Sequence, residues 1–293
     1  MDPTPKPSQT SSIEHPLEPD GESLVVKQVM DLLHSKDYRP PQLPSTAVQL
    51  LELAKEDNVQ PTQMVTLLER DPLLAAELLR LAQSSLYGGS FSVRTLDEAI
   101  VRLGLQRTAD LFLHAALETR VFKAKGYKKP MDQLRRHSVA VAHLSRLVGR
   151  EAGVFDQSAF MCGLLHDVGI AASLIAVVEC TPQGKKPPPF EEIWPAVSKV
   201  HQIAGGILAS SWNFPSDVTL VIERHHSFMI RDRPHPLATV VYLADWTAAQ
   251  LGFGFMDEQD DDGGTRALEI LQVGPTQAQK LLSKASKTLE NVT

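Results

Sequence analysis

The second half of the chain places histidine and aspartate side chains on segments that are otherwise apolar. Seven of them stand out, namely His137, His166, Asp167, His201, His225, His226 and Asp245. Iron, manganese and zinc accept imidazole nitrogen together with carboxylate oxygen, whereas calcium prefers a shell of oxygen atoms. This set of side chains therefore predicts a site for one or two divalent ions of Fe, Mn or Zn.

The spacing of apolar neighbours indicates that these residues face the interior of the protein. His137 is aligned with Leu134 and Val141, and Asp245 is aligned with Val241, at the intervals that share one face of a helix. The same pattern surrounds His166, His201 and His225. Helix faces of this kind pack against a core, so we expect the ionisable groups to meet there.

The most distinctive stretch runs from Phe160 to Gly169 and has the sequence FMCGLLHDVG. An apolar run of this kind is typical of a core helix, and it ends on His166 and Asp167. A buried charge is costly unless it is paired or bound to a cation. We therefore predict that Asp167 is the bridging carboxylate of a two-metal site.

A simpler interpretation treats each of these residues separately. A single histidine on an apolar face is usually a packed side chain with one hydrogen bond, and an aspartate there is usually a cap or an ion-pair partner. However, burying several such groups one by one would cost about 1–3 kcal/mol for each unsatisfied group. A shared cation would satisfy them together, so we favour one common pocket.

The elements that must position these residues are all predicted to be helices. A short helix is expected over Ser23–Ser35, and one helix after another from Ser45 to about Leu117. Asp71 and Thr95 are expected to cap helix N-termini, and Gly104 is expected to end a helix. Helices resume at Met131, and no strand alternation is found, so the predicted fold class is all-α.

Three segments lack this helical pattern. Residues 1–21 contain five prolines and predict a disordered tail. Residues 182–189 predict a flexible insertion, and Met256–Gly264 an acidic loop that lacks the glutamate of a calcium-binding EF-hand. A last amphipathic helix is expected over Thr276–Val292.

Composition excludes several classes of protein. The formal net charge of −6 argues against a general nucleic-acid binder, so no DNA partner is expected. The N-terminus shows no apolar signal core, and no run of about 20 apolar residues was found, so we expect a cytoplasmic protein with no membrane partner. Cys162 and Cys180 are expected to be reduced thiols.

Several of these motifs resemble those of a known superfamily. His137-Ser138, His166-Asp167 and Asp245 are similar to the pattern of the HD superfamily of metal-dependent phosphohydrolases. His201 with Gly205, and the pair His225-His226, resemble its HD-GYP branch of cyclic-dinucleotide phosphodiesterases.

The best overall resemblance, over roughly Leu43 to Gln250, is to the HDOD domain, the HD-related output domain. The stretches that carry it are, in chain order, Leu43-Pro44, Asp71-Pro72-Leu73, Leu79-Arg80-Leu81-Ala82, Ala99-Ile100-Val101-Arg102-Leu103-Gly104, Gly163-Leu164-Leu165-His166-Asp167-Val168-Gly169 and Trp212-x-x-Pro215.

The resemblance implies an HD-domain-like helical bundle with an additional N-terminal helical subdomain. We accordingly predict an N-terminal subdomain over residues 22–130, an HD-like subdomain with the metal pocket over residues 131–255, and the acidic loop with a C-terminal helix over residues 256–293.

The resemblance also implies a bacterial signalling or regulatory module that binds a signalling protein partner. A cyclic dinucleotide or a metal ion in the pocket would gate this binding. Two departures from active HD-GYP enzymes favour this role over catalysis. Ile170 stands where those enzymes carry a lysine, and residues 227–234 contain no Gly-Tyr-Pro stretch.

Two other functions stay open at this point. One is a metal-dependent phosphohydrolase or phosphodiesterase that acts on a nucleotide, and the other is a scaffold with a vestigial site. The remaining histidines His34, His114 and His143 are expected to be surface or packing residues. A basic cluster of Lys123, Lys125, Lys128 and Lys129 is expected to be a solvated loop.

Overall fold

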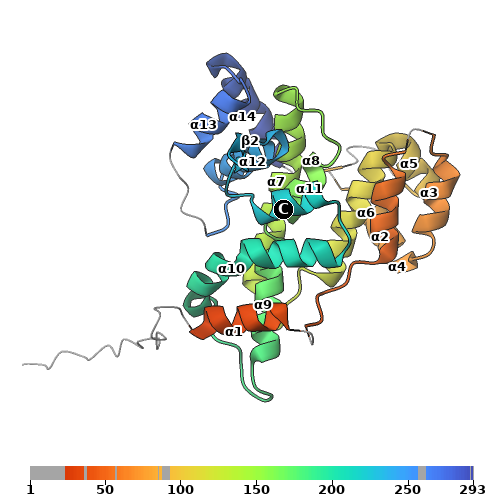
Figure 1. The fold of residues 1–293 in the computed structure, drawn as a ribbon. Helices are drawn as coiled ribbons and strands as arrows, with labels where there is room; N and C mark the ends of the chain where they lie inside the picture. Colours follow the sequence, from red (N-terminus) through yellow and green to blue (C-terminus); the bar gives the residue numbers. More distant parts are fainter. Residues whose placement is uncertain are drawn as a thin grey trace, which may run out of the picture.

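The computed structural model describes residues 24–35, 38–56, 58–84, 86–87, 93–256, 262–290 and 292. Within these ranges the regular secondary structure is helical except for one two-stranded hairpin, which confirms the all-α prediction (Figure 1). The tail predicted over residues 1–21 and most of the predicted acidic loop lie outside the described residues.

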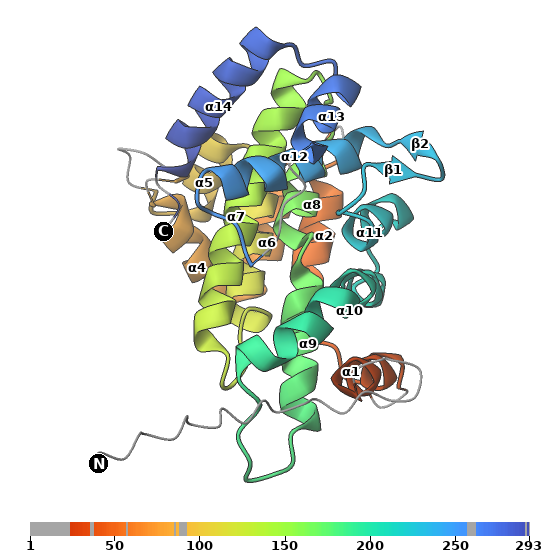
Figure 2. The same cartoon turned by 90° about the vertical axis from the view of Figure 1, so that its left-hand side faces the viewer.

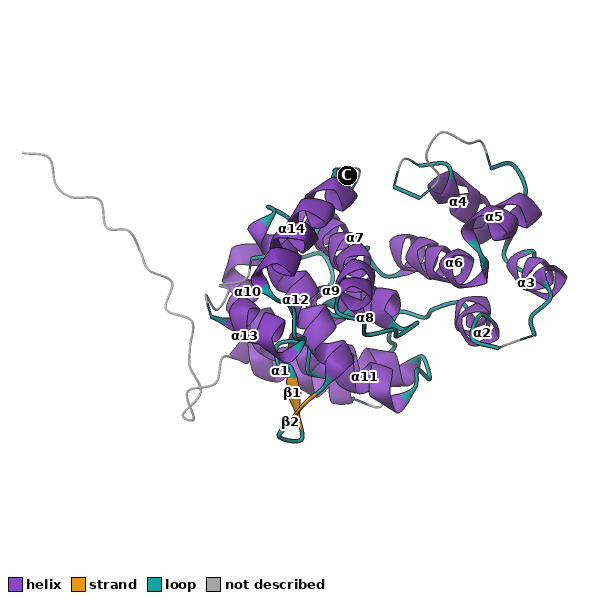
Figure 3. Ribbon diagram, turned by 90° about the horizontal axis from the view of Figure 1, so that it is seen from above, coloured by secondary structure: helices purple, strands orange, loops and turns teal. Residues whose placement is uncertain are grey.

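The first group of helices forms a separate bundle at one side of the molecule (Figures 1 and 3). It consists of α2 (Ser45–Leu53), α3 (Pro61–Leu68), α4 (Pro72–Ala82), α5 (Leu96–Leu103) and α6 (Leu105–Arg120). The predicted caps are confirmed, because the side chains of Asp71 and Thr95 accept hydrogen bonds from Leu74 N and Glu98 N. Gly104 ends α5 with a φ of 81°, a conformation that glycine adopts without strain.

The second group of helices builds the larger body around α7 and α9 (Figure 2). It consists of α7 (Lys128–Glu151), α8 (Ala159–Leu165), α9 (Val168–Cys180), α10 (Phe190–Ser211), α11 (Ser216–Glu223), α12 (Pro236–Gln250), α13 (Gly263–Ile270) and α14 (Pro275–Leu289). Helix α7 packs against α8, α12 and α14, and α9 packs against α10.

Helix α1 (Leu24–His34) packs against α9 and α10 of the larger body, away from the bundle that follows it in sequence (Figure 1). Its residues Val26, Val29 and Leu33 are buried there. Farther along the chain, Trp212 Nε1 donates a hydrogen bond of 2.8 Å to Pro41 O. This helix falls within residues 22–130, the predicted N-terminal subdomain, and its packing contacts are with the larger body. The predicted limits at residues 22, 130 and 255 stay predictions.

Three local features differ from the sequence-based expectation. Helix α7 begins at Lys128, before the expected Met131, because Pro130 lies in the first turn, where a missing N–H costs nothing. Met229–Ile230 pairs with Arg233–Pro234 in an antiparallel hairpin. Helix α13 was not expected at all.

An apolar helical segment runs through the centre of the larger body. Residues Ala159–Cys180, which comprise α8 and α9, are long and apolar enough to cross a membrane, and the sequence analysis did not find this run. However, 89% of its most apolar window is buried inside the protein. That burial favours a core helix over a membrane span.

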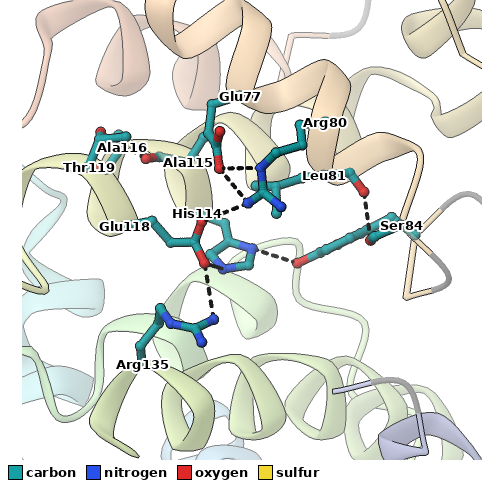
Figure 4. Close-up of polar contacts among 11 residues, drawn as sticks. Glu77, Arg80, Leu81, Ser84, His114, Ala115, Ala116, Glu118, Thr119 and Arg135 are labelled. Atoms are coloured by element: carbon teal, nitrogen blue, oxygen red, sulfur yellow. Dashed lines mark hydrogen bonds and ion pairs between the residues drawn. The ribbon is translucent and has the colours of Figure 1, made fainter. Parts of the chain in front are cut away.

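Two sets of ionic contacts join the N-terminal bundle to the larger body. Asp110 on α6 is buried and forms an ion pair with Arg146 on α7, whose guanidinium also lies 4.4 Å from the ring centroid of Phe160. Glu118 on α6 accepts hydrogen bonds from Arg135 on α7 at 3.1 Å and from Arg80 on α4 at 3.3 Å (Figure 4). The two halves are therefore held by charges as well as by apolar packing.

Candidate metal centre

The structure gathers all seven predicted side chains in one place, although they come from five parts of the larger body. His137 lies on α7 and Asp245 on α12, and His201 lies on α10. His166 and Asp167 occupy the junction between α8 and α9, while His225 and His226 directly follow α11. The side chains of the cluster are thus held in place by several different helices of the packed core.

Two glycines let the helices approach closely enough to form this cluster. A Cβ atom on Gly163 would lie 2.8 Å from Val141 O on α7, and a Cβ atom on Gly169 would overlap His201 O on α10. Both obstacles are backbone atoms, which cannot move aside as a flexible side chain can. The glycines on either side of His166-Asp167 therefore bring α7 and α10 to the dyad.

Asp167 lies at the centre of the cluster, and its two oxygen atoms face different histidines. Its Oδ2 is 3.4 Å from His137 Nε2 and 3.4 Å from His166 Nε2. Its Oδ1 is 3.1 Å from His225 Nε2 and 3.6 Å from His201 Nε2. This two-sided placement is the one expected of a carboxylate that bridges two ions.

The ligand atoms accordingly fall into two groups that share Asp167. One contains His137 and His166, and the other contains His201, His225 and His226, with the ligand atoms of each group within 4.8 Å of one another. Asp245 Oδ1 lies 3.4 Å from His137 Nε2, on the side of the first group. Nitrogen and carboxylate ligands in both groups match the chemistry of Fe, Mn or Zn.

Backbone carbonyls orient four of the imidazole rings. The Nδ1 atoms of His137, His166, His201 and His225 lie 2.7, 2.8, 2.7 and 2.7 Å from the carbonyl oxygens of Phe253, Gly163, Ser198 and Ile222. A carbonyl only accepts, so Nδ1 of each ring carries a proton, and Nε2 of each ring faces the centre. This is the arrangement that second-shell partners impose on metal-binding histidines.

The electrostatics of the cluster keep several of these groups in the form that binds metal. Burial lowers the pKa of His166 to about 3. Burial, followed by the nearby His225, lowers the pKa of His226 to about 3. Burial alone would raise the pKa of Asp167, but the surrounding histidines outweigh it and hold that pKa well below its ordinary value. The carboxylates act in the opposite sense on two other rings: against the effect of burial, Asp167 and Asp245 raise the pKa of His137 to about 9, and Asp167 raises that of His225. The centre therefore offers an ionised carboxylate together with neutral rings at His166 and His226.

The unsatisfied atoms of the cluster fit a cation. Both carboxylate oxygens of Asp167 are buried, and neither has a hydrogen-bond partner among the described residues. His137 Nε2 and His166 Nε2 approach to 3.0 Å, and His201 Nε2 and His226 Nε2 also approach to 3.0 Å. With Nδ1 of each ring protonated, two Nε2 lone pairs at that distance repel each other, and either a proton between the rings or a cation removes the repulsion. The cluster can therefore hold a divalent ion, while the assignment of each residue as a ligand stays a prediction.

Sequence reasoning missed the carbonyl groups that orient the rings. Phe253 O and Gly163 O belong to residues whose side chains carry no signal for this role, so only the folded backbone could reveal them. The structure also shows where the two departures from the enzyme pattern lie. Ile170 is buried in the first turn of α9, and residues 227–234 contain the hairpin.

A sequence model for the HDOD domain matches residues 41–228 of this chain. The chain is also 28% identical over 218 residues to an uncharacterised protein of Treponema pallidum (strain Nichols), a match that covers 71% of this chain. It spans only 42% of the length of that relative.

Solved structures share the fold. An HDOD domain protein of unknown function from Geobacter sulfurreducens matches with a TM-score of 0.65 at 22% identity, over 89% of this chain and 88% of that one. A protein from Shewanella amazonensis SB2B, provisionally named a metal-dependent phosphohydrolase, matches with a TM-score of 0.66 at 19% identity, over 91% and 96%. A protein from Marinobacter aquaeolei VT8, provisionally named a signal transduction protein, matches with a TM-score of 0.63 at 18% identity, over 92% and 64%.

Proposed function

Because the chain belongs to the HDOD domain family, we propose that it is a regulatory signalling module that acts through a protein partner. In this proposal the histidine and aspartate cluster binds one or two ions of Fe, Mn or Zn, and the bound ion, or a cyclic dinucleotide beside it, sets the state that the partner recognises. The names of the structural neighbours support both a signalling role and a metal-dependent hydrolase, so the geometry of this chain must distinguish them.

The observation that carries the regulatory role is the environment of Ile170. In the HD-GYP enzymes that this chain resembles, a lysine at the corresponding position handles a phosphate group. Here the side chain at that position is a hydrocarbon that is 1% exposed, packed in the first turn of α9 directly after the dyad. A buried isoleucine has no charge to offer to a phosphodiester.

The N-terminal bundle is the part that we propose for contact with the partner. Two large apolar side chains of this bundle, Leu73 on α4 and Val101 on α5, are 80% and 79% exposed. Both belong to stretches that carry the HDOD resemblance. Exposed apolar groups are a common component of protein interfaces.

Metal analysis and a turnover assay test the proposal together. We expect the purified protein to contain stoichiometric Fe, Mn or Zn, and Asp167→Asn to lose it, because the shared carboxylate serves both ligand groups. We further expect that the metal-loaded protein hydrolyses cyclic dinucleotides no faster than Asp167→Asn does. Hydrolysis at an enzyme-like rate that Asp167→Asn abolishes would contradict the regulatory role.

A metal-dependent phosphohydrolase is the second candidate, and the two-sided placement of Asp167 favours it. A bound divalent ion would supply Lewis acidity and lower the pKa of a bound water. Asp167, Asp245 and the histidines would hold the ion, with Asp245 Oδ1 3.4 Å from His137 Nε2. Full turnover in Asp167→Asn would exclude this mechanism, and an absence of metal from the wild-type protein would exclude both candidates.

A further inference from the structure

A second group of charged side chains lies outside the metal centre, where the N-terminal bundle meets α7 and α14. A cavity of about 230 Å³ opens there. Its polar lining comes from Tyr87 after α4, Arg107 on α6, Thr288 on α14, and His143, Arg146 and Arg150 on α7. Leucine side chains form the rest of its wall.

The cavity carries more positive than negative charge. Arg146 pairs with the buried Asp110, whose amide neighbour Gln106 donates a further hydrogen bond of 3.2 Å to the same carboxylate. Arg107 and Arg150 are exposed, and no carboxylate of the described residues lies within ion-pair distance of either. Of these three guanidinium groups, only that of Arg146 is paired with a carboxylate of the described residues, in a protein with a net charge of −6.

The basic side chains at this cavity are not fully neutralised by carboxylates. Burial, and then the like charges of Arg107 and Arg150, lower the pKa of Arg146, and Asp110 only partly offsets them. Burial, followed by the nearby Arg146, His114 and Arg107, lowers the pKa of His143 to about 3, so its ring is neutral. The buried Nε2 of His143 also has no hydrogen-bond partner among the described residues.

We propose that this cavity binds the phosphate group of a small phosphorylated ligand. The planar guanidinium matches phosphate oxygens with two parallel hydrogen bonds, and three arginines line this one cavity. A cavity of about 230 Å³ is below the range of roughly 300–1,000 Å³ typical of pockets that enclose a drug-sized ligand. In this proposal the cavity therefore encloses only the phosphate group. The remainder of the ligand lies against the leucine side chains and in solvent.

The position of the cavity gives such a ligand a structural effect. Arg107 belongs to the N-terminal bundle, whereas Arg146 and Arg150 belong to α7, the helix that also carries His137. A phosphate held by all three arginines would reinforce the junction already formed by Asp110 and Arg146. This site does not rest on the metal centre or on the proposed signalling role.

Calorimetric titration of the purified protein with inorganic pyrophosphate tests the site. We expect the wild-type protein to bind pyrophosphate, and Arg107→Gln and Arg150→Gln each to weaken binding at least about tenfold, the loss expected for charge-assisted hydrogen bonds. Because neither arginine is in an ion pair, both variants should keep the wild-type melting temperature.

Lys199→Gln on α10 is the matched control, since it removes one exposed positive charge far from the cavity lining. We expect it to change the affinity less than about twofold, as screened surface charges do. Absence of binding to the wild-type protein at millimolar pyrophosphate would overturn the proposal. So would binding that both arginine variants retain at wild-type affinity, because the anion would then lie elsewhere.

Discussion

Outside the metal centre, Glu118 is a single residue whose carboxylate joins several charged and polar side chains. Its carboxylate contacts Arg80 and Arg135, and its Oε1 is 3.5 Å from His114 Nε2 (Figure 4). His114, which was expected to be a surface or packing residue, is buried, and its Nδ1 lies 2.9 Å from Tyr87 Oη. Buried polar side chains of this kind stabilise only while every partner is present.

The pKa of Glu118 predicts how acid affects stability. Burial would raise this pKa, but His114, Arg135 and Arg80 outweigh it and lower it below the ordinary value. The unfolded chain therefore takes up the proton first as the pH falls, and the contribution to the free energy of unfolding, present above about pH 4.5, is lost below it. Glu118→Gln should lower the stability at pH 7 by about 2 kcal/mol and flatten its decline between about pH 5 and 3.

Urea denaturation of both proteins at a series of pH values measures this effect. Glu77→Gln is the control, because Glu77 pairs with Arg80 within the same helix at the surface. Such a pair contributes at most about 0.5 kcal/mol. If the free energy of unfolding declines with falling pH equally in the wild-type protein and in Glu118→Gln, the contacts of the Glu118 carboxylate do not stabilise the fold.

At the scale of elements, close contact between helices depends on glycine. Gly169→Ala would force a Cβ atom against His201 O and Gly205 N, so α9 and α10 would have to separate. We expect a loss of about 3 kcal/mol of stability, even though alanine alone favours a helix by about 1 kcal/mol. Because His201 lies on the displaced helix, the metal content should fall as well.

The control is Gly274→Ala at the N-cap of α14, where no heavy atom lies within 4 Å of the added Cβ. It should cost less than about 1 kcal/mol, the difference between glycine and alanine at an N-cap. Thermal denaturation and elemental analysis are the measurements. A Gly169→Ala protein as stable as the wild type would mean that the two helices are free to move apart.

The elements also show what the sequence could and could not predict. Caps at Asp71 and Thr95 and the end of α5 at Gly104 are local signals, and they were predicted because one side chain or one φ value decides them. Helix α13 was missed because Gly263 and Gly264 are poor helix formers. In the folded protein, Cβ atoms at these positions would overlap Tyr242 and Trp246 of α12, so packing selects glycine there.

Long-range partners were not predictable from these local signals. The apolar face of α1 indicated that it packs against something, but its pattern fits α9 and α10 no better than the bundle beside it in sequence. For the metal centre, the helical stripe predicted that His137, His166, His201, His225 and Asp245 face a common core. The stripe could not specify that Oδ1 and Oδ2 of Asp167 face different histidines, because that depends on how α8, α10 and α11 cross.

At the scale of the whole molecule, the two halves depend on the ion pair between Asp110 and Arg146. Arg146→Met should cost about 3–5 kcal/mol, because it leaves the carboxylate of Asp110 buried and unpaired. Adding Asp110→Asn to Arg146→Met should recover part of that loss, since no charge is then left in the interior. Denaturation of both single variants and the double variant measures the coupling.

Arg150→Met provides the reference, because Arg150 is exposed on the same helix and should change stability by no more than about 0.5 kcal/mol. A single Arg146→Met variant that is no less stable than this reference would mean that apolar packing alone joins the halves.

The buried segment Ala159–Cys180 has a consequence for the synthesis of the protein. It leaves the ribosome after α7 but before α10, which covers it in the finished fold. At a translation rate of roughly 5–20 residues per second, α9 is exposed to solvent for seconds before α10 has been synthesised. During that interval the newly made chain exposes a stretch that resembles a membrane anchor. We therefore expect the nascent chain to need protection, for example by chaperones, against aggregation and against insertion into a lipid bilayer.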